Sequence, residues 1–160
     1  MKGFTLLELL IVISIIGAIA FFAWVGLGQL GSKQNLADAA QSVVALLRDA
    51  QQRSITQADG SAWGVRFNNE PTGNLDGYYL FNNIDPSVAV SSFVLDSSLE
   101  LRQPSELDPP LEVVFKQISG ELDSLLCPSV LPPAVIETGI KVDLANSKII
   151  QIFCNGRIEF

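Results

Sequence analysis

Hydrophobic residues are concentrated at the N-terminal end of the chain. Residues 9–27 read LLIVISIIGAIAFFAWVGL and contain no charge. At about 1.5 Å per residue, a helix of this length extends roughly 28 Å, close to the thickness of the bilayer hydrocarbon core. The pattern therefore predicts a membrane-spanning helix over residues 4–30.

The pattern changes from continuous to periodic in the next segment. Apolar residues recur there at helical spacing, with polar residues on the other faces. The apolar positions are Leu36, Ala40, Val43, Leu47 and Ala50. We therefore expect one helix from about Thr5 to about Thr56, roughly 80 Å long, whose amphipathic half over 31–58 packs on the rest of the chain.

Three glycines and one tryptophan lie between the two halves. Gly26, Gly28 and Gly31 are compatible with a flexible joint, because glycine weakens a helix, or with close packing against other helices. Trp24 falls about 30 Å from Phe4 along a helix. A tryptophan at this distance suits either the far membrane interface or simple packing among other apolar side chains.

The remainder, 59–160, has the pattern of a strand-rich head. Asp59 and Gly60 end the helical pattern, and short runs rich in β-branched and aromatic residues follow. The predicted strands are 63–67, 78–81, 88–95, 111–118, 136–142, 149–154 and 157–160. Segments 68–76 and 119–133 have loop composition. Asn155 and Gly156 predict a type I′ turn in a terminal edge hairpin.

These elements predict an α+β fold, in which a long N-terminal helix packs on an antiparallel β-sheet. About 100 residues follow the apolar segment, enough for one compact domain and a modest core.

Composition narrows the possible functions. The net charge of −7 and pI near 4.4 disfavour binding to nucleic-acid phosphates. The absence of histidine removes the common catalytic triads and most transition-metal sites. We expect no enzyme activity, no cofactor and no metal site. We interpret the scattered acids as solvated surface: Asp76, Asp85, Asp96, Glu100, Glu106 and Asp108.

A cleaved secretory signal is one alternative for the N-terminus, since Ala18, Ile19 and Ala20 have the small-x-small form of a cleavage site. The apolar run continues beyond Ala20, however, and Glu8 interrupts its beginning. An acidic side chain in hydrocarbon costs on the order of a few kcal/mol without a partner. This residue therefore points to a retained helix.

Residues 2–12, KGFTLLELLIV, resemble the processing site of type IV pilins and type II secretion pseudopilins. The resemblance implies a leader over 1–3, cleavage between Gly3 and Phe4 by a prepilin peptidase, and N-methylation of Phe4. It also implies a single-pass protein in the cell membrane, in contact with lipid, with its head outside the cytoplasm. Its partners would be other pilin subunits, which contact it through the N-terminal helix in a filament.

In that family the glutamate matching Glu8 is thought to meet the N-terminal amine of a neighbouring subunit. At ~4 Å and an effective dielectric of ~20 such a pair attracts by about 4 kcal/mol before desolvation. We therefore expect Glu8 to act in assembly.

A second resemblance concerns the head. Residues 46–54, 63–67 and 155–158 are similar to GspH/FimT-like minor pseudopilins, which implies a minor subunit near a filament tip. A secretion system, a pilus and a competence apparatus all remain compatible. The alternatives are an adhesin or DNA-uptake minor pilin, for which Arg66 and Arg157 form a poor basic patch, and a membrane-tethered hydrolase, for which no nucleophile motif is present.

Cys127 and Cys154 are the chain's two cysteines. In an oxidising compartment they can form a disulfide, which stabilises by roughly 3 to 4 kcal/mol on the chain-entropy model. Two free thiols are the alternative, and a metal pair lacks further soft ligands.

Overall fold

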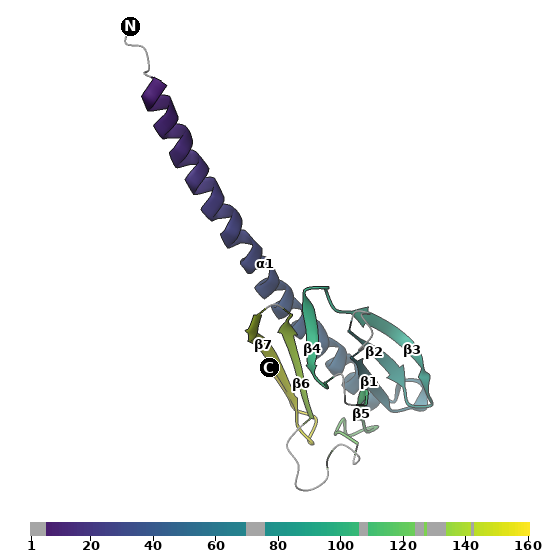
Figure 1. Ribbon diagram of the computed structural model, residues 1–160. Helices are drawn as coiled ribbons and strands as arrows, with labels where there is room; N and C mark the ends of the chain where they lie inside the picture. Colours follow the sequence, from purple (N-terminus) through teal and green to yellow (C-terminus); the bar gives the residue numbers. More distant parts are fainter. Residues whose placement is uncertain (1–5, 70–75, 106–108, 124–126, 128–133, 142) are drawn as a thin grey trace.

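The computed structural model describes residues 6–69, 76–105, 109–123, 127, 134–141 and 143–160; of these, the side chains of 22–30, 86 and 144 are not described. A single helix, α1 (Leu6–Ile55), projects from a β-rich head (Figure 1). Its 50 residues correspond to about 75 Å. The helix passes through Gly26, Gly28 and Gly31 without interruption, so these glycines do not end it.

The C-terminal end of α1 is marked by a change of backbone conformation. Gln57 has a φ of 54°, and a short 3-10 helix, η1 (Ala58–Gly60), contains Asp59 at a φ of 55°. The predicted helix end, at about Thr56, lies one residue beyond its position in the structure.

The head contains two antiparallel sheets. The first has the order β3-β2-β1-β5 and the second the order β4-β6-β7-β8. The strands of the first sheet are β1 (Trp63–Asn68), β2 (Gly77–Asn82), β3 (Asp85–Val94) and β5 (Leu111–Phe115). Those of the second are β4 (Leu99–Gln103), β6 (Ala134–Ile140), β7 (Asp143–Ile152) and β8 (Ile158–Glu159).

The expectation of one sheet is therefore wrong, although each predicted strand overlaps an observed one. The missed strand is β4, in which Leu99 and Leu101 are buried. Glu100 and Arg102 alternate with them and lie on the other side of the strand. Because β4 pairs with β6 and not with β3, the chain passes into the second sheet at this strand.

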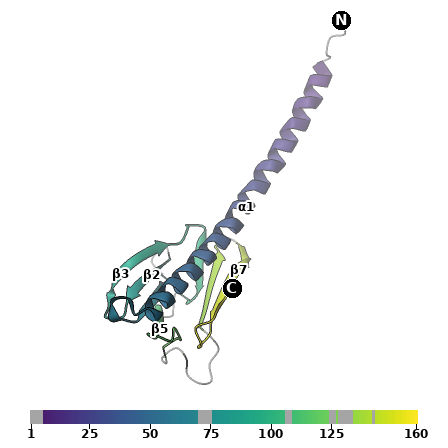
Figure 2. The ribbon, with the colours of Figure 1, turned by 180° about the vertical axis from the view of Figure 1, so that it is seen from behind.

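The amphipathic half of α1 packs on strands of both sheets, as Figures 1 and 2 show. All five residues of the predicted apolar stripe are buried, from Leu36 at 4% exposure to Leu47 at 0%. They join one core with aromatic and aliphatic residues of the strands, among them Trp63, Phe67, Phe115 and Ile136. The α+β architecture, with the helix on antiparallel sheets, is confirmed.

Asp76 corrects the interpretation of the acidic residues. Its side chain is buried, and its carboxylate accepts a hydrogen bond from the Leu101 N–H at 2.7 Å. Its carbonyl accepts another from the Leu95 N–H at 2.8 Å. A buried carboxylate needs such partners, and here it fastens the beginning of β2 to β4.

Three further acids lie in or beside strands: Asp85 begins β3, Glu100 lies within β4, and Asp96 is exposed just after β3. Glu106 and Asp108 lie outside the described residues.

The terminal hairpin occurs at the sheet edge as predicted, with a different turn. The Gly156 N–H donates to the Phe153 carbonyl at 2.8 Å, and the Phe153 N–H donates to the Arg157 carbonyl at 2.9 Å. Gly156 has a φ of 81°, whereas Asn155 is not among the described residues with positive φ. The expected type I′ turn is therefore wrong, because it requires positive φ at both central residues.

Candidate functional site

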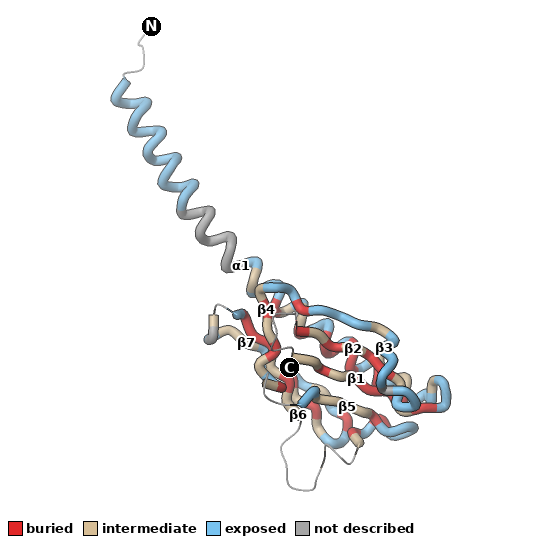
Figure 3. The backbone as a smooth tube through the Cα atoms, turned by 45° about the vertical axis from the view of Figure 1, so that its right-hand side comes forward, coloured by how far each residue is buried: buried red, intermediate tan, exposed pale blue. Residues whose placement is uncertain are grey.

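Residues 6–21 of α1 carry 11 of the 20 exposed large hydrophobic side chains of the described chain. Every described side chain from 6 to 21 is exposed, as the uniformly pale blue helix in Figure 3 shows. Leu6 is 82% exposed, Ile16 61% and Phe21 66%. Burying apolar surface is worth roughly 25 cal/mol per Å². This half of the helix therefore offers a large gain in free energy to lipid or to other helices that cover it.

Glu8 is the acidic residue in the first turn of α1, and it is exposed. A negative charge at a helix N-terminus interacts favourably with the helix dipole. It is set among leucines, with Leu7 at 71% and Leu9 at 58% exposure. Gly3 and Phe4, the predicted processing site, lie outside the described residues, as does the side chain of Trp24.

The two cysteines form a disulfide, with sulfur atoms 2.06 Å apart and a sequence separation of 27. This disulfide is the one predicted as possible for the chain's two cysteines. Cys154 lies in the turn between β7 and β8, and its carbonyl accepts a hydrogen bond from the Leu122 N–H at 3.1 Å. The disulfide therefore joins Cys127 to the terminal hairpin.

Sequence reasoning missed a charged aromatic cluster on the face of the first sheet opposite the core. Arg66 of β1 forms an ion pair with Glu112 of β5 and donates a hydrogen bond to the Tyr79 hydroxyl of β2. Its guanidinium also lies 5.5 Å from the ring centre of Phe81. Burial lowers the pKa of Arg66, but the Tyr79 hydrogen bond and the Glu112 charge outweigh it, so the pKa is raised.

This cluster holds three strands together. Arg66 pairs across the sheet with Tyr79 on one side and with Glu112 on the other. The three residues are far apart in the sequence, so the cluster could have been identified only if the pairing of β1 with β2 and β5 had been known.

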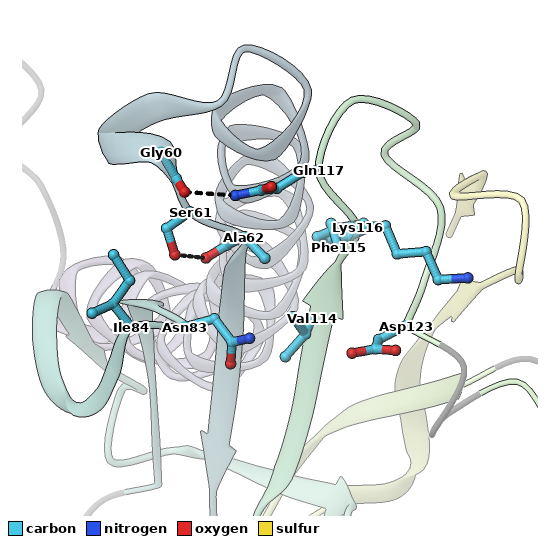
Figure 4. A pocket seen from close by; sticks show the side chains of 10 residues that line it. All are labelled: Gly60, Ser61, Ala62, Asn83, Ile84, Val114, Phe115, Lys116, Gln117 and Asp123. Atoms are coloured by element: carbon cyan, nitrogen blue, oxygen red, sulfur yellow. Dashed lines mark hydrogen bonds between the residues drawn. The ribbon is translucent and has the colours of Figure 1, made fainter.

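An open depression of about 410 Å³ lies where β1 begins and β5 ends (Figure 4). Hydroxyl, amide and charged side chains line it, including Ser61, Asn83 and Lys116. The Gln117 amide crosses one side of it and donates to the Gly60 carbonyl at 2.8 Å. Over the described part of the chain, no three metal-binding side chains are grouped as a metal site.

Comparison with known proteins gives one match. Residues 1–24 match the family model described as the prokaryotic N-terminal methylation motif. Neither the search of curated proteins nor that of solved structures finds a match. The motif supports a type IV pilin-like, membrane-anchored protein that is processed by a prepilin peptidase and assembles with other pilins.

Within the described residues, no helix combines the length and the hydropathy needed to cross a membrane.

Proposed function

We propose that the chain is a minor pilin or pseudopilin of the GspH/FimT type, in a type IV pilus or a type II secretion-like filament. It is inserted in the membrane as a single-pass protein, cleaved between Gly3 and Phe4, methylated at Phe4 and polymerised. The observation that carries the proposal is the continuity between the methylation motif over 1–24 and the exposed apolar half of α1.

The shape of the molecule supports this role. The apolar half of α1 projects away from the head, and none of its described side chains, 6–21, belongs to the core (Figures 1 and 3). Lipid covers such a helix before assembly, and the same helices of neighbouring subunits cover it afterwards. Transfer between two apolar surroundings costs little free energy, so the subunit can leave the membrane for a filament.

The charge of Glu8 favours transfer of the subunit from the membrane into the filament. A carboxylate in an apolar environment gains from a nearby cation, and cleavage after Gly3 creates an amine at Phe4. We propose that Glu8 of one subunit pairs with the amine of the next, which fixes the register between neighbouring helices. The rest of the apolar surface provides contact area without specifying register.

Arginine–carboxylate ion pairs argue against the DNA-uptake alternative. A DNA-binding role requires arginines that are available to phosphates. Four arginines lie instead within 4 Å of a carboxylate: Arg53, Arg66, Arg102 and Arg157. We propose that the chain is a non-enzymatic filament subunit without a nucleic-acid partner.

The test is the intact mass and N-terminal residue of the full chain, purified from membranes of hosts with and without prepilin peptidase. We expect a chain that begins at N-methylated Phe4 only where the peptidase is present. The variant Glu8→Ala should still enter the membrane but should fail to join filaments, with Glu121→Ala, at an exposed acid of the head, as the control. A chain that begins near Phe21 would instead establish a cleaved signal peptide and overturn the proposal.

A further inference from the structure

Beyond its first two residues, Asp85 and Pro86, the edge strand β3 lacks the charges and prolines that usually protect an edge from pairing with another chain. It is the last strand of the first sheet and has β2 as its partner on one side. Residues 86–95 carry no charge, and Val88, Val90 and Val94 are 54%, 49% and 64% exposed. Edge strands normally carry charges or prolines along their length. Here Asp85 and Pro86 are the first two residues of the strand, whose pairing with β2 is irregular over 85–91, and Asp96 lies just after it. Residues 88–94 carry neither a charge nor a proline.

A groove follows this strand on the side of the sheet that faces α1. Two adjoining depressions, of about 320 and 300 Å³, share Ser42 of the helix and Phe93 of β3. Ala45 and Leu46 line the second depression with apolar surface, and Asp49, which also lines it, is paired with Arg53 at 2.9 Å. Small residues on α1 keep the groove open, and Phe93, 44% exposed, forms its opposite wall.

The Phe93 ring is held in place by stacked aromatic side chains of the core. Its ring stacks on Tyr78, with ring centres 5.5 Å apart, and Tyr78 stacks in turn on Phe67 at 6.0 Å. Tyr78 and Phe67 are buried. The wall of the groove is therefore a rigid extension of the core, and a ligand would not have to order it.

One end of the groove is acidic. Asp38 of α1 and Asp96, just after β3, both line the first depression. The Ser98 hydroxyl and N–H donate to the Asp96 carboxylate at 2.6 and 2.9 Å, which fixes its position. Both carboxylates are exposed. A cation seated here would gain from two negative charges.

We propose that the outer edge of β3 is a docking site for an extended segment of a different protein. That segment would be apolar at alternate positions and basic at the end beside Asp38 and Asp96. Added strands recognise a partner in this way, because main-chain hydrogen bonds provide affinity while pockets accept alternate side chains. In an antiparallel arrangement the basic residue lies at the N-terminal end of the segment.

Charge disfavours a second copy of this chain as the occupant. Two β3 strands paired antiparallel would place Asp96 of one copy near Asp85 of the other, and each copy has a net charge of −7. Like charges opposed across a strand pair are destabilising. The site therefore goes beyond the assembly role of α1, and its occupant is a partner that joins the head.

The test uses the full chain in detergent micelles and a fluorescent peptide, acetyl-Lys-Thr-Val-Thr-Val-Thr-Val-amide. We expect saturable binding by anisotropy, and slower amide hydrogen exchange over 88–94. Val90→Lys should weaken binding by about tenfold or more. Ile149→Lys is the matched control, since Ile149 is 47% exposed on β7 of the other sheet, and it should leave binding unchanged. A peptide with Glu in place of Lys should bind more weakly, and more so at low salt.

Three results would overturn the proposal: no saturable binding, equal binding to Val90→Lys, or protection confined to other strands. Concentration-dependent dimerisation that Val90→Lys abolishes would also overturn it, because that result would assign β3 to pairing between copies. None of these measurements depends on cleavage or filament assembly, so the docking site can fail while the proposed function stands.

Discussion

The Gln51 side chain donates a hydrogen bond from Nε2 to the Gly156 carbonyl at 2.9 Å, across 105 residues of sequence. The same nitrogen donates to the Gly120 carbonyl, also at 2.9 Å. Both glycines are buried and have positive φ, at 81° and 67°. A side chain at either glycine would collide with its neighbours in this contact. One amide of α1 thus fastens the terminal hairpin and the loop after β5 to the helix.

Replacing this amide should destabilise the head. We expect Gln51→Ala to lower the free energy of unfolding by about 1 to 3 kcal/mol, because it leaves two buried carbonyls without their donor. Gln52→Ala is the matched control, since Gln52 is the next residue on the helix and is exposed. Urea unfolding followed by circular dichroism measures both. Equal effects of the two substitutions would contradict the role assigned to Gln51.

Tyr78 should make stability fall at alkaline pH. Burial raises its pKa above the ordinary value of 10.0, and a hydrogen bond with the Ser42 side chain opposes part of this effect. The folded state therefore retains the phenolic proton at a pH where the unfolded chain releases it. The free energy of unfolding contributed by this group is constant below about pH 10 and decreases above it.

The measurement compares urea unfolding of the parent chain and Tyr78→Phe from neutral to alkaline pH. The parent should lose stability more steeply above pH 10, and the absorbance of tyrosinate should show one late-titrating tyrosine that the variant lacks. Parallel curves for the two proteins would contradict the buried, neutral state of Tyr78.

The disulfide should stabilise the head mainly through the unfolded chain. It closes a loop with a sequence separation of 27, for which chain entropy predicts about 3 to 4 kcal/mol. We expect Cys127→Ser, Cys154→Ser and the double variant to lose stability by similar amounts. Reduction of the parent should lower its unfolding midpoint to that of the double variant. A double variant as stable as the oxidised parent would contradict this account.

Hydrophobic periodicity was sufficient to predict the helix and its buried face. Leu36 through Ala50 recur at a spacing that only a helix places on one side, and the core indeed forms there. Strand positions other than β4 were also predictable, from runs rich in β-branched and aromatic residues. Alternation tells which side of a strand is buried, however, and not which strand lies next to it. The division into two sheets therefore could not be derived.

The same limit applies to the polar contacts. Asp76 ends a segment whose residues are typical of a surface loop, so its burial could not be predicted. That burial depends on a hydrogen bond from the Leu101 N–H, which only the folded chain brings near. Arg66 and Glu112 meet because β1 pairs with β5, a register that the sequence does not specify. Glu8, by contrast, stood out in the sequence because a charge within an apolar run is unusual in itself. Its role in assembly stays a prediction that rests on the resemblance to type IV pilins.

The two halves of α1 should respond differently to the same kind of substitution. Leu47 is fully buried in the core of the head, whereas Ile19 is 64% exposed on the projecting half. Leu47→Ala removes buried methyl groups and leaves a cavity, so we expect a loss of about 2 to 5 kcal/mol in the unfolding of the head. Ile19→Ala should change the same free energy by less than about 0.5 kcal/mol, since exposed positions contribute little. Urea unfolding of both variants in detergent micelles tests whether the two halves of α1 contribute differently to the stability of the head. A large effect of Ile19→Ala would mean that the projecting half contributes to the head's own stability, and the helix could then not be exchanged freely between lipid and neighbouring subunits.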